Sequence, residues 1–284
     1  MVYIPAGSFT MGDALDGKPD AVAVDTTVSA FYMDATEVTY TQWQTVYTWA
    51  TNNGYSFDNP GRGKGATYPV EMVSWYDSVK WCNARSEKEG KTPAYYITTN
   101  NWTNGTNFYR TGNIDLTSAN VNWSANGYRL ATEAEWERAA RGGLSSQRFP
   151  WGEKISQSLA NYYGDTNQFS YDLGPNGFNS TWDTGGYPFT SPVASFATNA
   201  YGLYGMAGNV CEWCWDWYGT PYSGGTDPHG SVTGSHRVLR GGGWNRFASA
   251  CAVASRIYFV PGDTSVSDER ESDFGFRAVL PLGQ

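Results

Sequence analysis

The sequence predicts an α+β fold in which a few helices support short strands and long loops. Three segments carry helix-start signals, and the rest of the chain lacks a sustained helical or strand period. The composition points the same way, because 33 glycines and 13 tryptophans accompany only 16% charged residues. The excess of Ala, Glu, Lys, Leu and Arg that is typical of coiled coils and helical arrays is missing. We expect a single domain over residues 1–284.

Each predicted helix begins with a capping box. In this motif a Ser or Thr side chain and an acidic or amide side chain three residues later each accept a backbone N–H of the other residue. Apolar residues then recur on one face. The pairs are Thr39 and Gln42 for a helix over 39–50, Ser74 and Asp77 for a helix over 74–89, and Thr132 and Glu135 for a helix that ends at Gly142 and Gly143.

The remaining segments predict strands and loops. Residues 2–11 alternate weakly, as a short strand does, and the aromatic run 213–217 predicts a strand or a packed loop. Thr, Asn and Tyr dominate 96–128, which predicts hairpins. Gly, Pro, Asn and Ser dominate 144–200 without any period. A loop that long must be held by specific contacts if it belongs to a compact domain.

Charge and cysteine content exclude several classes. The net charge of −8 and the pI of about 4.8 leave no basic footprint for nucleic acid. No apolar run reaches the roughly 18 residues that span a bilayer, and the first residues show no signal peptide. Four cysteines are too few for a disulfide scaffold. Cys211 and Cys214 have redox spacing, but they lie in the aromatic run rather than at a helix start, which favours buried thiols.

Several motifs occur in order along nearly the whole chain. They are IPAGSFTMG at 4–12, GYRLATEAEWE at 127–137, GLYGMAGNVCEW at 202–213, RGGGW at 240–244 and FGFR at 274–277. Together they resemble the formylglycine-generating-enzyme (sulfatase-modifying factor) family. The resemblance implies an elaborated, loop-rich C-type-lectin-like fold of the formylglycine-generating-enzyme type.

The resemblance also indicates which positions of this chain correspond to the catalytic residues of the family. Oxidase members of the family bind copper through two cysteines, which suit Cu(I) as soft thiolates. The corresponding positions here are Arg246 and Cys251. Arginine is a fixed cation and cannot be a copper ligand. We therefore expect no enzyme and no catalytic cofactor. A copper oxidase acting on a substrate cysteine, or an inactive regulatory paralogue of one, stays open as an alternative.

Metal sites of other kinds have weaker support. Iron-dependent relatives need a histidine-rich triad, whereas this chain has only His229 and His236, which we expect to be solvated loop side chains. Asn209 and Glu212 match positions that contribute to a structural calcium in the family, and hard oxygen donors suit Ca²⁺. The alternative is that these two side chains satisfy buried backbone groups.

The C-terminal segment 240–277 alternates between family-like frame residues and positions where family members often carry Asn. Here those positions hold other side chains. This pattern resembles the variable proteins of diversity-generating retroelements, treponemal ones in particular, in which Asn codons are mutated at adenines. The resemblance implies a variable, ligand-binding face made of Arg246, Phe247, Ser249, Ala250, Ser255, Ile257, Tyr258, Phe259 and Gly262.

We therefore expect a non-enzymatic protein that presents this face to a macromolecular ligand, a protein or a glycan, and not to nucleic acid. Aromatic side chains supply rigid contact area at low entropic cost, as in antibody paratopes. A strand at 257–259 would expose at least one of its three large side chains. The resemblance implies a cell-surface or exported lipoprotein, bound to a membrane only through a lipid anchor that this chain does not contain.

Overall fold

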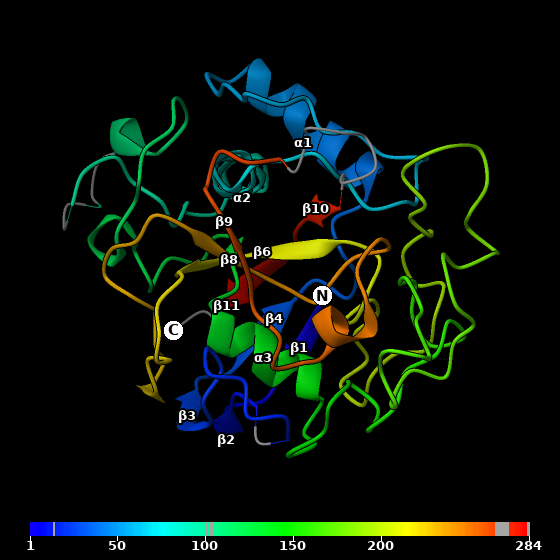
Figure 1. Cartoon of the computed structure of the whole chain (residues 1–284). Helices are drawn as coiled ribbons and strands as arrows, with labels where there is room; N and C mark the ends of the chain where they lie inside the picture. The colour runs from blue at the N-terminus through cyan, green and yellow to red at the C-terminus, as the bar shows by residue number, and fades with distance from the viewer. Residues whose placement is uncertain (14, 100–101, 103–104, 265–272, 283–284) are drawn as a thin grey trace.

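The computed structural model describes residues 1–13, 15–99, 102, 105–264 and 273–282 (Figure 1). The α-helices are α1 (Tyr40–Thr51), α2 (Trp75–Lys88) and α3 (Glu133–Arg141). The strands are β1 (Val2–Ile4), β2 (Gly7–Met11), β3 (Val24–Val28), β4 (Phe31–Met33), β5 (Arg129–Leu130), β6 (Cys211–Trp217), β7 (Gly225–Thr226), β8 (Arg237–Arg240), β9 (Ile257–Phe259), β10 (Phe274–Gly275) and β11 (Ala278–Pro281). The fold is α+β, as the sequence predicts.

Three small sheets share the strands. The first has the order β1-β4-β11-β5, the second β10-β6-β8-β9 and the third β2-β3-β7. In the second sheet β6 pairs antiparallel with β8, and β8 pairs antiparallel with β9, which forms the edge. The C-terminal segment thus supplies both β8 and its edge partner. Figure 1 shows α2 and α3 on opposite sides of the β6–β8 pair.

The helix starts agree with the sequence. Both hydrogen bonds of the capping box are present at Thr39, Ser74 and Thr132. The third helix ends at Gly142, which adopts the left-handed conformation with φ of 58°. Glycine takes this conformation without the steric cost of a Cβ atom. None of the helices is long and apolar enough to cross a membrane, within the residues that the structure covers.

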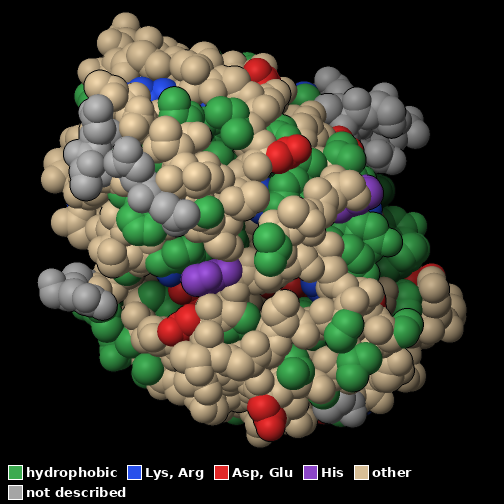
Figure 2. All heavy atoms as spheres, turned by 90° about the vertical axis from the view of Figure 1, so that its left-hand side faces the viewer, with side chains coloured by type: hydrophobic (Ala, Val, Ile, Leu, Met, Phe, Trp, Pro, Cys, Tyr) green, Lys and Arg blue, Asp and Glu red, His purple; other side chains and the backbone are tan. Residues whose placement is uncertain are grey.

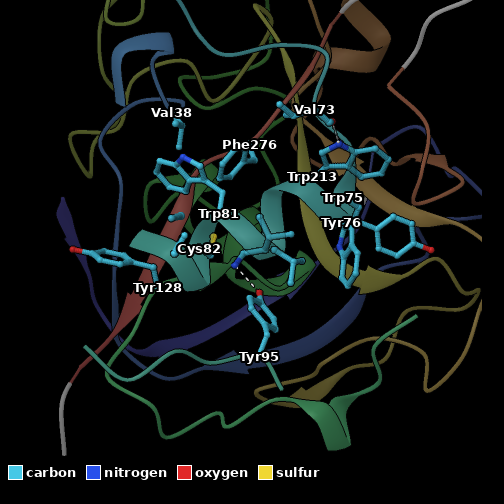
Figure 3. Close-up of a cluster of buried hydrophobic side chains, with 14 of the residues drawn as sticks. Val38, Val73, Trp75, Tyr76, Trp81, Cys82, Tyr95, Tyr128, Trp213 and Phe276 are labelled. Atoms are coloured by element: carbon cyan, nitrogen blue, oxygen red, sulfur yellow. Dashed lines mark hydrogen bonds between the residues drawn. The ribbon is translucent and has the colours of Figure 1, made fainter. Parts of the chain in front are cut away.

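Alternating side chains of β6 contribute to two of the hydrophobic core clusters. Trp213 and Trp215 face α2, where they pack in one cluster with Trp75, Trp81 and other aromatic rings. Figure 3 shows Trp213 beside Trp75 in this cluster. Cys214, between them in sequence, faces α3 and packs in the cluster that holds Trp136. Successive strand side chains point to opposite faces, so one strand serves both clusters. All residues of β6 are buried, which confirms the prediction from the aromatic run.

The region 96–128 differs from the sequence prediction. The hairpins expected over 96–128 do not form among the described residues, which instead contain the 3-10 turns Gly105–Asn107 and Ser118–Asn120 and isolated bridges. Their Asn and Thr side chains bond to nearby backbone and so compete with a strand ladder.

The long segment between α3 and β6 contains no helix or strand and is held by polar side chains instead. Asp172 accepts hydrogen bonds from the Tyr162 hydroxyl and from the backbone N–H of Asp165 and Gly174. Asn179 Nδ2 donates to the Gln157 carbonyl at 2.9 Å. These buried contacts are the specific restraints that a loop of this length requires.

Candidate ligand-binding face

The candidate face is formed where the chain leaves β8, turns at Gly241–Gly243, passes a 3-10 turn at Ala248–Cys251 and returns as β9. The turn needs glycine. Gly242 has φ of 72°, and a Cβ atom there would lie 2.8 Å from Cys251 Sγ. An L-residue with a side chain rarely adopts such a φ, and the close contact adds overpacking. The turn therefore fixes the path of the segment between the two strands.

Buried arginines hold the segment from below. Arg240, fully buried, donates to Glu137 Oε2 and to the backbone carbonyls of Ser255 and Val253 at 2.8 and 2.6 Å. Arg256 forms a bidentate pair with Glu133 at 2.7 and 2.8 Å. Glu133 and Glu137 are one turn apart on α3. This helix therefore binds both ends of the 240–256 stretch through ion pairs. Buried charges of this kind are tolerated only when they are paired and hydrogen-bonded.

Frame and variable positions differ in burial. Every residue assigned to the frame is buried: Arg240, Gly241, Gly242, Gly243, Trp244, Cys251, Val253, Ala254, Arg256, Pro261, Phe274, Gly275, Phe276 and Arg277. Eight of the nine variable positions are exposed or half-buried: Arg246, Phe247, Ser249, Ala250, Ile257, Tyr258, Phe259 and Gly262. Ser255 is the exception. Its side chain is buried beside Lys18 Nζ at 3.3 Å, so its assignment to an accessible face is wrong.

The accessible positions form two groups. Phe247, 40% exposed, packs edge-on against Tyr163 at 5.4 Å between ring centroids. Tyr258, 44% exposed, stacks on Tyr218 at 3.9 Å. On the opposite face of β9, Ile257 and Phe259 are half-buried against the core, as strand alternation requires. The contacts among described residues do not join the two groups. The sequence also predicts one accessible patch over six of these positions, and that stays a prediction: Arg246, Phe247, Ser249, Ile257, Tyr258 and Phe259.

Sequence reasoning missed two aromatic neighbours of Phe247, Tyr163 and Phe169, and a third ring, Phe178, that reaches it through Tyr163. Tyr163 contacts Phe178 at 4.8 Å, and Phe169 lies 5.9 Å from Phe247 between centroids. All three rings come from the segment between α3 and β6 and are half-buried. They surround Phe247 with further accessible aromatic surface. The only signal in the sequence was the recurrence of aromatic residues in a segment without a period.

The position of the family's copper ligands does not fit copper. Arg246 donates to both carboxylate oxygens of Asp273 at 2.7 and 3.1 Å. Cys251 is fully buried, and burial raises the pKa of its thiol to about 12. A metal ligand must be the thiolate, which such burial disfavours. One protonated thiol beside a fixed cation does not form a two-thiolate site.

The expected calcium site does not fit either. Both carboxylate oxygens of Glu212 accept from Arg277, at 2.6 and 2.7 Å, and one also accepts from the Trp136 indole. Asn209 Oδ1 accepts from Ser191 N at 2.8 Å. A guanidinium thus occupies the place that a calcium ion would take beside Glu212. The side chains satisfy buried groups, which is the alternative reading of these residues.

Glu37 lies in the same buried network. Its Oε1 accepts from Asn209 Nδ2 at 2.9 Å, and its Oε2 has no hydrogen-bond partner. Burial raises the pKa of Glu37 to about 7, against the lowering effect of Arg277. Desolvation disfavours the charged carboxylate more than the nearby guanidinium favours it. Within the described parts of the chain, no group of three or more His, Cys, Asp or Glu side chains is placed to hold a metal ion.

The two histidines are not equivalent. His236 Nδ1 lies 2.8 Å from Ser235 Oγ, and its ring contacts Tyr258 edge-on. His229 stacks on Trp123 with centroids 3.5 Å apart and is half-buried. The expectation of a solvated loop side chain is therefore wrong for His229, because an aromatic partner covers one face of its ring.

Comparison with known proteins identifies relatives over nearly the entire chain. Residues 1–282 match the family model described as "Sulfatase-modifying factor enzyme 1-like domain". The chain is 30% identical to the formylglycine-generating enzyme of Streptomyces coelicolor over 98% of its length and 88% of that protein. It is 37% identical to the chaperone protein LppX of Paenibacillus barcinonensis, over 77% of this chain and 70% of that protein. The structure of Treponema denticola variable protein 1 matches with a TM-score of 0.73 and 30% identity, over 99% of this chain and 95% of that one.

Proposed function

The chain belongs to the sulfatase-modifying factor enzyme 1-like domain family, and from this premise we propose that it is a non-enzymatic binding protein. In this proposal the C-terminal segment presents a variable face to a macromolecular ligand, a protein or a glycan. The observation that carries the proposal is the split in burial within one segment. All frame residues are buried, whereas eight of nine positions assigned as variable remain accessible.

The physical logic is that of a paratope on a rigid support. Side chains that contribute nothing to the core change with little effect on stability, within about 0.5 kcal/mol at ordinary surface sites. Phe247 and Tyr258 are large, exposed and each held by two ring contacts, so they lose little entropy when a ligand covers them. The similarity to Treponema denticola variable protein 1 supports the same function. Export to the cell surface as a lipoprotein is part of the proposal.

Selection from a library tests this directly. The eight accessible positions are randomised together, the variants are displayed on yeast, and clones are selected against three unrelated purified globular proteins. A matched library randomises eight frame positions. We expect folded display and specific binders from the face library only. Failure to obtain binders, or binders that keep their affinity after the original eight residues are restored, would contradict the proposal.

An oxidase assay separates the competing enzyme hypothesis. The copper-treated chain is incubated with oxygen and a cysteine-containing sulfatase peptide, with Cys251→Ala as the matched variant. Because Arg246 and the buried Cys251 do not form a two-thiolate site, we expect no aldehyde product from either protein. Turnover by the original chain that is lost in Cys251→Ala would establish the oxidase instead.

The neighbouring genome provides an independent check on variation. We expect a near-copy of the DNA that encodes 240–277, differing at adenines, beside a reverse-transcriptase gene. Sequencing of that locus in several isolates would then show changes at the accessible positions and constancy at the frame. Changes spread evenly over both sets would contradict the assignment.

A further inference from the structure

A cavity of about 320 Å³ lies outside the candidate face and shares no residue with it. This volume is at the lower end of the usual range for small-molecule sites, roughly 300–1,000 Å³. Figure 2 shows a face on which a histidine lies beside charged side chains of both signs. Six polar or aromatic residues of its lining point to a ligand: Ser29, Trp123, Arg129, Glu135, Asp227 and His229.

One wall is a fixed pair of aromatic rings. His229 and Trp123 stack with centroids 3.5 Å apart and planes within 4°. Trp123 also packs edge-on against the buried Trp215 at 5.7 Å, which anchors the pair to the core. Burial lowers the pKa of His229, and the nearby Arg129 lowers it further. At neutral pH the ring is therefore uncharged, with one nitrogen that donates and one that accepts.

The opposite charges in the cavity are also fixed. Arg129 NH1 and NH2 donate to the two oxygens of Glu135 at 2.6 and 2.7 Å. The Asp227 carboxylate accepts from Ser29 N at 2.6 Å and from Ser29 Oγ at 2.7 Å. Both carboxylates are thus held in place before any ligand arrives. A carboxylate oxygen has more than one acceptor site, so each can still accept from a ligand hydroxyl.

Several polar atoms in the cavity wall lack a protein partner. Among the described residues, no hydrogen bond reaches the His229 ring nitrogens or Trp123 Nε1. These half-buried ring nitrogens are therefore available to a ligand that both donates and accepts hydrogen bonds.

We propose that this cavity binds one neutral pyranose ring, free or at the end of a glycan. Sugar hydroxyls donate to Asp227 and Glu135 and accept from the protonated ring nitrogen of His229 or from Trp123 Nε1, while the C–H face of the ring packs on the exposed side of the His229–Trp123 pair. An anion would meet two carboxylates, and a purely apolar ligand would leave the fixed polar groups unpaired. An amino acid fits poorly, because Glu135 already occupies both terminal nitrogens of Arg129.

Titration with simple sugars tests the inference. The full chain is titrated with the methyl glycosides of glucose, galactose, mannose and N-acetylglucosamine, followed by saturation-transfer NMR and calorimetry. Glycine and inorganic phosphate serve as the zwitterionic and anionic probes. We expect at least one glycoside to bind, and neither glycine nor phosphate to compete with it.

Matched variants locate the binding. Asp227→Asn preserves the shape of the side chain, and His229→Ala removes the ring face. Each is expected to weaken binding at least about tenfold, the effect of losing one hydrogen bond to a charged group or a comparable packing contact. His236→Ala and Tyr258→Ala should leave affinity unchanged. Circular dichroism and thermal unfolding confirm that each variant is folded.

Three results would overturn the inference: no glycoside binds, glycine or phosphate binds in preference, or Asp227→Asn and His229→Ala bind as tightly as the original chain. A sugar that binds but depends on Tyr258 would place recognition on the candidate face instead. That outcome rejects the cavity site and leaves the proposed function standing, so the two failures are distinguishable.

Discussion

Within 240–277 two sets of residues alternate along the chain, yet they differ in what they contribute to the fold. The frame is buried although it contains arginines, whereas the accessible set includes large aromatic rings that face solvent. This reverses the usual distribution of charged and apolar side chains. From the reversal we expect the stability of the segment to depend mainly on the frame residues, and much less on the exposed rings of Phe247 and Tyr258.

The two arginines Arg240 and Arg246 show the contrast within one residue type. Arg240 is fully buried and bonds to Glu137 and to two backbone carbonyls across the turn. Arg246 is half-buried, and its side chain lies against Asp273 with 29% of its surface exposed. The first arginine joins β8, α3 and the 253–256 stretch, and the second covers the edge of the face.

The largest effect is expected from Arg240→Met. Removal of the guanidinium leaves Glu137 with less compensation and two carbonyls without a donor, so unfolding free energy should fall by about 3–5 kcal/mol. Urea unfolding followed by tryptophan fluorescence measures the change. Tyr258→Ser is the comparison, with a loss of less than about 1.5 kcal/mol from one aromatic contact. Equal losses in both proteins would remove the distinction between frame and face.

Two glycines of the segment give the next contrast. Gly242→Ala places a Cβ atom 2.8 Å from Cys251 Sγ at φ of 72°. The strain and overpacking should cost about 2–4 kcal/mol. Gly262 has no positive φ, and its nearest neighbour would be 3.8 Å away, so Gly262→Ala should change stability by at most about 0.5 kcal/mol. Thermal unfolding of the pair decides whether the predicted order holds.

Buried Glu37 should make stability depend on pH. Its pKa is raised to about 7 in the folded chain, so the native state binds the proton more tightly than the unfolded state does. The favourable contribution is complete below the unfolded pKa near 4.5 and is lost as pH rises toward and past 7. Glu37→Gln removes this dependence. Between pH 5 and pH 8 the original chain should lose about 1–3 kcal/mol relative to the variant.

Urea titrations of both proteins across that pH range measure the difference. The unfolding free energy of the variant is subtracted from that of the original chain at each pH, because other buried acids titrate in both proteins alike. One of them is Asp216, whose pKa is raised to about 8 by burial. A difference that stays constant with pH would show that Glu37 is ionised in the folded state at all these pH values.

The smallest effect concerns Ser255, which sequence reasoning placed on the wrong side. Its buried hydroxyl lies 3.3 Å from Lys18 Nζ, so Ser255→Ala should cost about 0.5–1.5 kcal/mol. Ser249→Ala, at a half-buried position outside the frame, should be neutral within about 0.5 kcal/mol. Calorimetric unfolding of the two variants resolves this difference, and the reverse order would return Ser255 to the accessible set.

Local signals in the sequence were sufficient for the helices. Thr39, Ser74 and Thr132 carry complete capping boxes, and each one starts a helix in the structure. These signals act over three residues, so they can be read without knowledge of the fold. Local signals separate the frame from the face only in part. The alternation at 257–259 is local, but the burial of Ser255 depends on Lys18, which is 237 residues away.

Long-range contacts explain what sequence reasoning could not supply. Glu212 is paired with Arg277, 65 residues away, and this pairing engages both carboxylate oxygens that the family resemblance assigns to calcium. His229 stacks on Trp123, which lies in a loop distant in sequence, and both residues line a cavity that no sequence motif predicts. Both arrangements depend on which segments meet in space, and spacing along the chain does not encode this.

Simultaneous substitution of the face tests the central claim most directly. The variant Phe247→Asn, Ser249→Thr, Tyr258→Asn and Gly262→Ala changes four accessible positions and leaves the frame intact. We predict a folded protein whose unfolding free energy lies within about 2 kcal/mol of the original, because surface effects are small and nearly additive. Denaturant unfolding together with a two-dimensional NMR spectrum provides the measurement. Loss of the native spectrum, or destabilisation as large as that of Arg240→Met, would show that the face is part of the structural core.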